Sequence, residues 1–362
     1  MEIFGPEDLA ARFAPLRQAQ GVLLAVSGGP DSVALMLLMQ SWARQCEGVA
    51  AVPLAVATVD HGLRSESRNE AEMVAGWAKS LGLQHRILTW EGAKPASRIQ
   101  EAARTARYGL LFGHAKEIGA DHLLTAHQAD DQAETILFRL LRGSGFSGLA
   151  GMAVATRRGA LIHFRPLLDC PKEVLIALCE ARGQPFFRDP SNENPRFARA
   201  RLRRLAPMLA AEGLDRDALL RLGRRAARAD LALDACAEKC RATLNATRVG
   251  GAFVGEIGGL AAEPAEILLR IVEAELRLLG VDKPLRLDRL ETLTASLQVA
   301  LQKGGAWRGS LAGMAFSLNR GAVLTICPEK PRRRGRSATG STENSPLREV
   351  AAHNYRDPAT TG

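Results

Sequence analysis

The sequence predicts an α/β fold: an open parallel sheet in the N-terminal half, then a mostly helical region and a small α+β region. Three observations support this. Short apolar runs alternate with segments of helical periodicity up to about residue 141, as in a parallel sheet covered by helices. Glycine and polar residues follow these runs, at the strand ends where open α/β sheets bind ligands. From about residue 170 the chain becomes rich in Ala, Arg and Leu.

The first half contains four predicted strands, each a short apolar run that ends in polar or glycine residues. They are Val22–Val26, Leu54–Val59, His85–Thr89 and His122–Ala126. The segments between and after them have apolar residues at helical spacing. They predict helices at Ser32–Arg44, Asn69–Leu81, Arg98–Ile118 and Asp130–Leu141. This alternation predicts a Rossmann-like sheet.

The second half is less regular. A glycine-rich break at Arg142–Leu149 is followed by a predicted helix at Lys172–Arg182 and a loop at Arg188–Pro195. The stretch Phe197–Leu244 has helical character. Residues 250–327 form a smaller mixed region, with strands expected near Met314–Leu318 and Ala322–Ile326. The sequence therefore predicts three parts: 1–205, 206–329, and a basic and polar tail at 330–362 that we expect to be disordered.

The composition is that of a globular protein, with 46% apolar and 24% charged residues. Lys and Arg number 48 against 39 Asp and Glu, and a net charge of +9 is typical of proteins that bind nucleic acid, although Arg-rich chains also occur without such a partner. No apolar run reaches the roughly 18–20 residues of a membrane span, and the N-terminus lacks the basic region of a secretory signal. Six cysteines in 362 residues do not indicate a disulfide framework. We expect a cytoplasmic protein without membrane contact.

The segment SGGPDS lies between the first predicted strand and the first predicted helix. Gly28 and Gly29 permit a sharp turn and a close approach of the backbone to a ligand. The start of the helix favours an anion, the hydroxyls of Ser27 and Ser32 add donors, and Asp31 is suited to hold Mg²⁺. A plain strand-to-helix turn with Ser and Asp as caps is the alternative. The flanking strand and helix favour a phosphate site, although the spacing is not that of a Walker A loop.

This segment resembles the SGGxDS signature of the PP-loop ATP pyrophosphatases. Members of that family cleave ATP between the α- and β-phosphates and adenylate an oxygen of their substrate. The resemblance implies that the loop holds the departing pyrophosphate, with ATP and Mg²⁺ as cofactors and Asp31 as the metal ligand. The implied nucleotide-binding residues are Ser27, Gly28, Gly29, Pro30, Asp31, Ser32, Asp60 and His61.

Further motifs narrow the resemblance. In order, they are VDHGLR (59–64), EAARTARYG (101–109), TAHQADDQAETILFRLLRGSGFSGLAGM (125–152), FRPLL (164–168) and DPSN (189–192). Over roughly residues 20–205 the set resembles the tRNA(Ile)-lysidine synthetase family. That family joins L-lysine to the wobble cytidine of the CAU-anticodon isoleucine tRNA through an adenylated cytidine, giving lysidine, AMP and pyrophosphate. The resemblance implies an ATP-binding catalytic PP-loop domain at 1–205 and a tRNA-binding region at 206–329.

Asp130, Asp131 and Glu134 form an acidic cluster at the start of a predicted helix. Spacings of three and four place Glu134 on the same helical face as the two aspartates. Such a cluster suits the binding and deprotonation of an ammonium group. Acids in a first helical turn also complement the helix dipole, so this alternative stays open. The resemblance implies catalytic roles for Asp31, Arg107, Asp131 and Glu134.

Arg104 and Arg107 are able to form bidentate contacts with phosphate oxygens, although solvated helix arginines are the alternative. His61 and His127 lie just after predicted strands; an ordinary loop residue is the alternative for His61, and a structural hydrogen-bonding histidine is the alternative for His127. Substrate binding is predicted for Arg104, His127 and Asp130.

Arginines also gather in the stretch DPSNENPRFARARLRRL (189–205). Arginine suits contact with phosphates and stacking on unpaired bases, and a solvated charged face is the alternative. The predicted tRNA-binding residues are Arg196, Arg199, Arg201, Arg203 and Arg204.

Two other functions fit parts of the sequence. A related PP-loop enzyme, either a tRNA thiolase or an amidotransferase, is one; the sequence contains no C-x-x-C pair, and no glutamine-hydrolysing domain is evident. A non-catalytic, nucleotide-responsive RNA-binding protein is the other, and the acidic cluster argues against it. The sequence leaves the oligomeric state open, a homodimer included.

Overall fold

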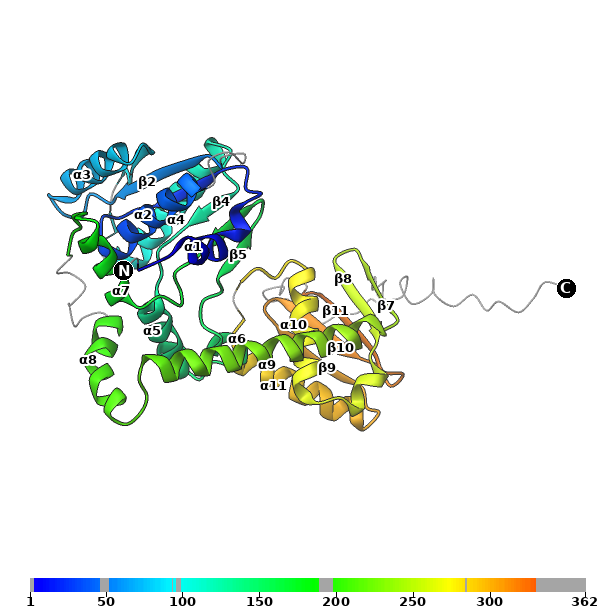
Figure 1. Ribbon diagram of the computed structural model, residues 1–362. Helices are drawn as coiled ribbons and strands as arrows, with labels where there is room; N and C mark the ends of the chain where they lie inside the picture. Colours follow the sequence, from blue (N-terminus) through cyan, green and yellow to red (C-terminus); the bar gives the residue numbers. More distant parts are fainter. Residues whose placement is uncertain are drawn as a thin grey trace. The chain divides into compact units, whose positions relative to one another are not determined.

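The computed structural model describes residues 3–45, 52–92, 94–95, 99–188, 198–283 and 285–329, with the backbone alone for 198–200. The chain divides into two compact units, Met1–Lys239 and Cys240–Gly362 (Figure 1). The division predicted from the sequence, at 205/206, falls inside helix α8 (Ala198–Ala211). The predicted tail at 330–362 lies outside the described residues.

A six-stranded sheet in the order β3-β2-β1-β4-β6-β5 forms the centre of the first unit. All neighbouring strands are parallel except the antiparallel pair β5–β6. The strands are β1 (Val22–Ala25), β2 (Leu54–Asp60), β3 (Gln84–Thr89), β4 (His122–Leu124), β5 (Ala155–Arg158) and β6 (Leu161–Phe164). All four predicted strands are present and parallel, which confirms the predicted fold class.

Helices cover both faces of this sheet. In β1, Val22 and Leu24 belong to one core cluster and Leu23 to another, because successive strand residues point to opposite faces. The first cluster includes α2 and the second includes Leu111 of α4. Each fully buried leucine contributes roughly 1.5–3 kcal/mol. The helices are α1 (Pro6–Arg12), α2 (Pro30–Gln45), α3 (Ser67–Ser80), α4 (Ile99–Glu117), α5 (Ala129–Leu140), α6 (Phe146–Leu149) and α7 (Lys172–Ala181).

The strand order creates a topological switch point between β1 and β4. From β1 the chain passes to β2 and β3 on one side, and it then returns to β4 on the other side of β1. Ligands of open α/β sheets bind in the crevice outside the carboxyl ends of the strands at such a point. The segments that follow β1 and β4 carry SGGPDS and the acidic cluster, so the fold brings these two motifs to one place.

Several elements of this unit differ from the prediction. The hairpin β5–β6 was not predicted, because its strands are four residues long and β5 ends in two arginines. The helical stretch Phe197–Leu244 is two helices, α8 and α9 (Arg216–Ala242), separated around Gly213, whose φ of +87° ends helical geometry. Helix α1 and the 3₁₀ turn Ala14–Leu16 were also not predicted.

The second unit contains a five-stranded antiparallel sheet in the order β7-β8-β11-β10-β9. The predicted strand Met314–Leu318 is β10, and the predicted Ala322–Ile326 is found as β11 (Val323–Pro328). In the described part of the chain, no helix has the length and apolar character to cross a membrane. The remaining elements are β7 (Ala246–Val249), β8 (Ala252–Glu256), a 3₁₀ helix (Gly258–Ala262), α10 (Ala265–Leu278), α11 (Leu287–Gln302) and β9 (Trp307–Leu311).

Candidate active site

The loop between β1 and α2 turns sharply at Gly28. The φ of Gly28 is +84°, a conformation that side chains disfavour. A Cβ atom there would lie 2.5 Å from Cδ2 of Phe187, whose backbone N–H donates to the Gly28 carbonyl at 2.8 Å. The segment after α7 therefore packs against one side of the loop. Only glycine fits at position 28.

Internal hydrogen bonds hold the rest of the loop. The hydroxyl of Ser32 accepts from the Ser27 N–H at 3.1 Å and donates to the Gly29 carbonyl at 2.9 Å. Helix α2 starts at Pro30, which has no N–H, and the amides of the next two residues have no intrahelical acceptor. The loop thus presents unpaired helical amides beside the exposed Ser27, as an anion site requires.

Asp31 is the charged group at the centre of the site. Its Oδ1 is buried and has no hydrogen-bond partner among the described residues. The pKa of Asp31 is raised to about 6, mainly by burial; the charge of Lys172 opposes the rise, Asp131 and Asp130 add to it, and Arg203 opposes it. The loops after β1 and β4 are therefore close enough to interact electrostatically.

A magnesium ion fits this arrangement. Within the described ranges no three His, Cys, Asp or Glu side chains form a ready metal cluster. Magnesium commonly takes one or two carboxylates and completes its octahedron with water and substrate phosphates. A buried carboxylate oxygen next to an anion-binding loop is a donor of that kind.

We expect Asp31→Asn to raise the melting temperature near pH 8 by several degrees in the absence of ligands. The folded-state pKa of about 6 lies above the ordinary value of 3.8, so ionisation of Asp31 opposes folding. This penalty is absent below about pH 4, grows as the pH rises to about 6, and is then constant at roughly 1–3 kcal/mol. Thermal melts of wild type and Asp31→Asn at several pH values measure the difference between their melting temperatures, which should disappear near pH 4. A difference that does not depend on pH would contradict the raised pKa of Asp31.

The acidic cluster opens helix α5, and one of its members caps that helix. The Gln128 side chain accepts from the N–H groups of Asp130 and Asp131, while an oxygen of Asp131 accepts from the Gln128 N–H at 3.3 Å. Asp130 accepts from the Lys172 N–H at 3.2 Å. Asp131 thus completes a capping box with Gln128, a role that was not assigned to it from the sequence, where only the helix dipole was considered.

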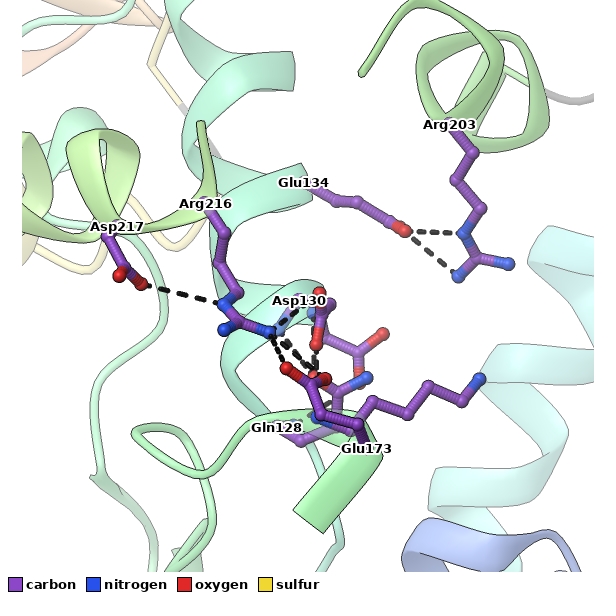
Figure 2. A network of polar contacts seen from close by, with 9 residues as sticks. Gln128, Asp130, Glu134, Glu173, Arg203, Arg216 and Asp217 are labelled. Carbon is purple, nitrogen blue, oxygen red and sulfur yellow. Dashed lines mark hydrogen bonds and ion pairs between the residues drawn. The ribbon is translucent and has the colours of Figure 1, made fainter. Parts of the chain in front are cut away.

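Arginines from two other helices already contact this cluster (Figure 2). Arg203 of α8 forms an ion pair with Glu134, whose side chain is only 14% exposed. Arg216 of α9 lies 2.8 Å from Glu173 and 3.5 Å from Asp130. The carboxylates therefore attract cationic side chains, as a binding site for an ammonium group would.

Asp60 and His61 lie at the end of β2. Asp60 is buried, and one of its oxygens accepts from the Gly62 N–H at 2.9 Å and from the Ser67 hydroxyl at 2.7 Å. These bonds lower its pKa although burial acts in the opposite direction. His61 packs edge-on against Trp90, and burial, followed by the charge of Arg107, lowers its pKa. Asp60 thus holds the turn after β2 through its hydrogen bonds. His61 lies close enough to Arg107 for the two side chains to interact electrostatically.

Arg104 and Arg107 of α4 lie over the ring of Tyr108, at 5.1 and 5.6 Å from its centroid. His127 is held by Thr125 at 2.8 Å, and its pKa falls to about 3 because of burial and the charges of neighbouring arginines, Arg104 and Arg107 among them. The structure brings the predicted arginines and histidines together on this side of the switch point, in a positive environment that suits phosphate.

Several residues of the site were not identified from the sequence. Phe187 and Lys172 carry no motif signal. Arg165 is the second residue of the motif FRPLL and His163 precedes that motif, which was quoted without assigning roles to its residues. Their position beside the site depends on the unpredicted hairpin.

The predicted tRNA-binding arginines lie in or before α8. Arg196 lies outside the described residues, and only the backbone of Arg199 is described. Arg201 and Arg204 are exposed, and Arg203 contacts Glu134. Leu202 anchors the helix in a core cluster with Ile136 of α5.

Residues 6–209 match the family model of the PP-loop domain. A tRNA(Ile)-lysidine synthase from Methylobacterium sp. (strain 4-46) is 50% identical over 346 residues, covering 92% of this chain and 97% of that protein. One from Bradyrhizobium sp. (strain BTAi1) is 46% identical over 338 residues, covering 89% and 94%. Among solved structures, the U34-tRNA thiolase NcsA from Methanococcus maripaludis aligns with a TM-score of 0.51 and 16% identity over 61% of this chain and 77% of that one, a likeness of fold.

Proposed function

This chain belongs to the PP-loop family and, within it, to the tRNA(Ile)-lysidine synthases, and from this premise we propose that it ligates L-lysine to the wobble cytidine of a CAU-anticodon isoleucine tRNA. The reaction would consume ATP with Mg²⁺ and release pyrophosphate and AMP in the cytoplasm. The observation that carries the proposal is the meeting of an anion-binding loop and an acidic cluster at one switch point, where Asp131 and Asp130 raise the pKa of Asp31.

In the first step the O2 oxygen of cytidine would attack the α-phosphate of ATP, and the bond to the β-phosphate would break. The loop from Ser27 to Ser32 would hold the departing pyrophosphate through helical amides and hydroxyls. Arg107, with Arg104 beside it, would neutralise the α-phosphate. Bound at Asp31, Mg²⁺ would supply charge neutralisation on the phosphates.

In the second step the ε-amine of lysine would attack C2 of the adenylated cytidine. The C2–N bond forms, the C2–O bond breaks, and AMP leaves with that oxygen. The ammonium must first lose a proton, and a carboxylate of the cluster would accept it. Glu134 and Asp131 are the best placed, since a spacing of three residues puts both on one face of the first turns of α5.

Binding of lysine requires rearrangement of the contacts in Figure 2. The ammonium of lysine would take the place of the Arg203 guanidinium on Glu134. Arg216 would remain on Glu173 and steady Asp130.

One assay tests the proposal: ATP, labelled lysine and unmodified isoleucine tRNA are supplied, and AMP and labelled RNA are measured. We expect lysine-dependent AMP release with label in the RNA. A thiolase would require a sulfur donor instead, and a pure binding protein would release no AMP. Either result would overturn the proposal.

The thiolase alternative has little support from the two buried cysteines of the first unit. Cys170 and Cys179 are buried, and burial raises the pKa of each thiol to about 12. Neither would be a thiolate at neutral pH, as a sulfur-transferring nucleophile needs to be.

Replacing Arg199, Arg201 and Arg203 together with Ala should weaken tRNA binding and flatten its salt dependence. Each lost phosphate contact reduces the slope of log K against log salt concentration by roughly 0.7–0.9. Filter binding at a series of salt concentrations measures this slope. The matched control replaces Arg17, Arg44 and Arg86, three exposed arginines on other elements, and should keep the wild-type slope. Equal slopes for both triple variants would contradict the tRNA contact.

A further inference from the structure

A continuous series of hydrogen bonds connects Arg165, which follows the hairpin β5–β6, to His127 at the candidate active site. A guanidinium nitrogen of Arg165, Nη2, lies 3.0 Å from Nδ1 of His163. Nε2 of His163 lies 2.8 Å from the hydroxyl of Thr125, and the same hydroxyl lies 2.8 Å from Nδ1 of His127. Thr125 follows β4, and His163 lies in the adjacent strand β6.

The directions of these bonds follow from the donors. A guanidinium only donates, so Nδ1 of His163 accepts and its ring proton must be on Nε2. That Nε2–H donates to the Thr125 hydroxyl. Thr125 has one proton to donate, and Nδ1 of His127 is the acceptor that lies within reach of its hydroxyl among the described residues, so we assign Thr125 as the donor in this bond. Because Nδ1 of His127 accepts, its own ring proton is on Nε2.

The Arg165 end of this hydrogen-bond series and its second member, His163, are fixed by further contacts. Nη1 of Arg165 donates to the Ala153 carbonyl at 2.8 Å and to the Thr156 hydroxyl at 3.1 Å, so the hairpin fixes the guanidinium. His163 is 1% exposed and packs against Tyr108, with ring centroids 5.4 Å apart. Among the described residues, Nε2 of His127 has no recorded hydrogen-bond partner, which leaves it available to a ligand.

We infer that Arg165, His163 and Thr125 are positioning residues that keep His127 neutral, with its proton on Nε2, as a hydrogen-bond donor to a phosphate oxygen of the bound nucleotide. This inference rests on the proposed function for the identity of the nucleotide. Phosphate is the favoured acceptor because Arg104, Arg107 and Arg165 all act on His127 electrostatically. The pKa values of His127 and His163, each lowered to about 3, are consistent with neutral rings.

One consequence concerns proton transfer. In this arrangement Nδ1 of His127 is occupied and Nε2 already carries a proton. His127 is therefore not the base that deprotonates lysine, and that role is left to the carboxylates of the acidic cluster.

The tautomer is measured directly on the wild-type protein by nitrogen NMR with ¹⁵N-labelled histidine. The His127 signals are identified by their loss in His127→Gln. We expect one protonated nitrogen, Nε2, and one unprotonated nitrogen, Nδ1, from about pH 6 to 8. A proton on Nδ1, or on both nitrogens near pH 7, would overturn the inference. This readout needs no turnover, so it stands or falls separately from lysidine formation.

Two pairs of variants test the functional part through AMP release. A glutamine amide reaches the position of Nε2, whereas an asparagine amide reaches only that of Nδ1. We expect His127→Gln to stay within about 10-fold of wild type and His127→Asn to lose at least about 100-fold. Thr125→Val should lose roughly 10- to 100-fold, and Thr125→Ser, which keeps the hydroxyl, should restore most of the rate. Equal losses for Gln and Asn, or a normal rate for a folded Thr125→Val, would contradict the inference.

Discussion

Asp31→Asn should reduce AMP formation by at least about 100-fold while tRNA affinity stays within about twofold of wild type. The substitution keeps the size of the side chain and removes the charge of a carboxylate whose Oδ1 is buried and has no hydrogen-bond partner in the part of the chain that the structure describes. Because the predicted tRNA contacts are in α8, binding of RNA should not depend on this charge. AMP release and filter binding, measured on the same preparation, separate the two effects.

Asp282→Asn is the matched control, since it removes one negative charge from an exposed turn of the second unit and should leave both values unchanged. The metal-binding role is refuted if Asp31→Asn retains AMP formation. A large loss of tRNA affinity would contradict it as well, because the residue would then act on RNA binding or on the fold.

Gly28→Ala is expected to lower the unfolding free energy by about 1–3 kcal/mol and to reduce ATP affinity at least about 10-fold. Two effects combine. The φ of +84° becomes strained, and the new Cβ would lie 2.5 Å from the Phe187 ring. Gly29→Ala is the control in the same loop, because its φ is not positive and its Cβ would meet nothing nearer than 3.9 Å.

A double-mutant cycle with Phe187→Ala separates the two effects. Chemical denaturation of the four proteins gives their unfolding free energies. If the ring clash matters, Gly28→Ala should destabilise the Phe187→Ala background less than it destabilises wild type, and the residual loss measures the backbone strain. Strictly additive effects would show that Phe187 does not confine the loop.

The sequence was sufficient to predict the helices and strands whose apolar residues recur with a strong periodicity. Strands such as Leu54–Val59 are apolar runs bounded by polar residues, and burial on both faces of a parallel sheet produces that pattern. The hairpin β5–β6 was missed for two reasons: β5, ATRR, is polar at the edge of the sheet, and β6, LIHF, is an apolar run of only four residues. The break at Gly213 was missed because the Ala and Arg content on its two sides is alike.

The site was predictable where a local motif carries the chemistry, as in the loop that contains Gly28 and Asp31. It was not predictable where a role depends on packing between distant segments. Phe187 lies about 160 positions from the glycine it confines, and no local pattern marks it. The same holds for the contact between Arg203 and Glu134, which joins two helices that the sequence assigned to different substrates.

That contact bears on how amino acid affinity should be measured. If lysine binds at Glu134, the guanidinium of Arg203 is an internal competitor, and the apparent dissociation constant for free lysine exceeds the intrinsic one by the reciprocal of the fraction of molecules in which the carboxylate is vacant. Titrations of the protein with lysine alone will therefore understate the affinity that applies when RNA phosphates draw the arginine away.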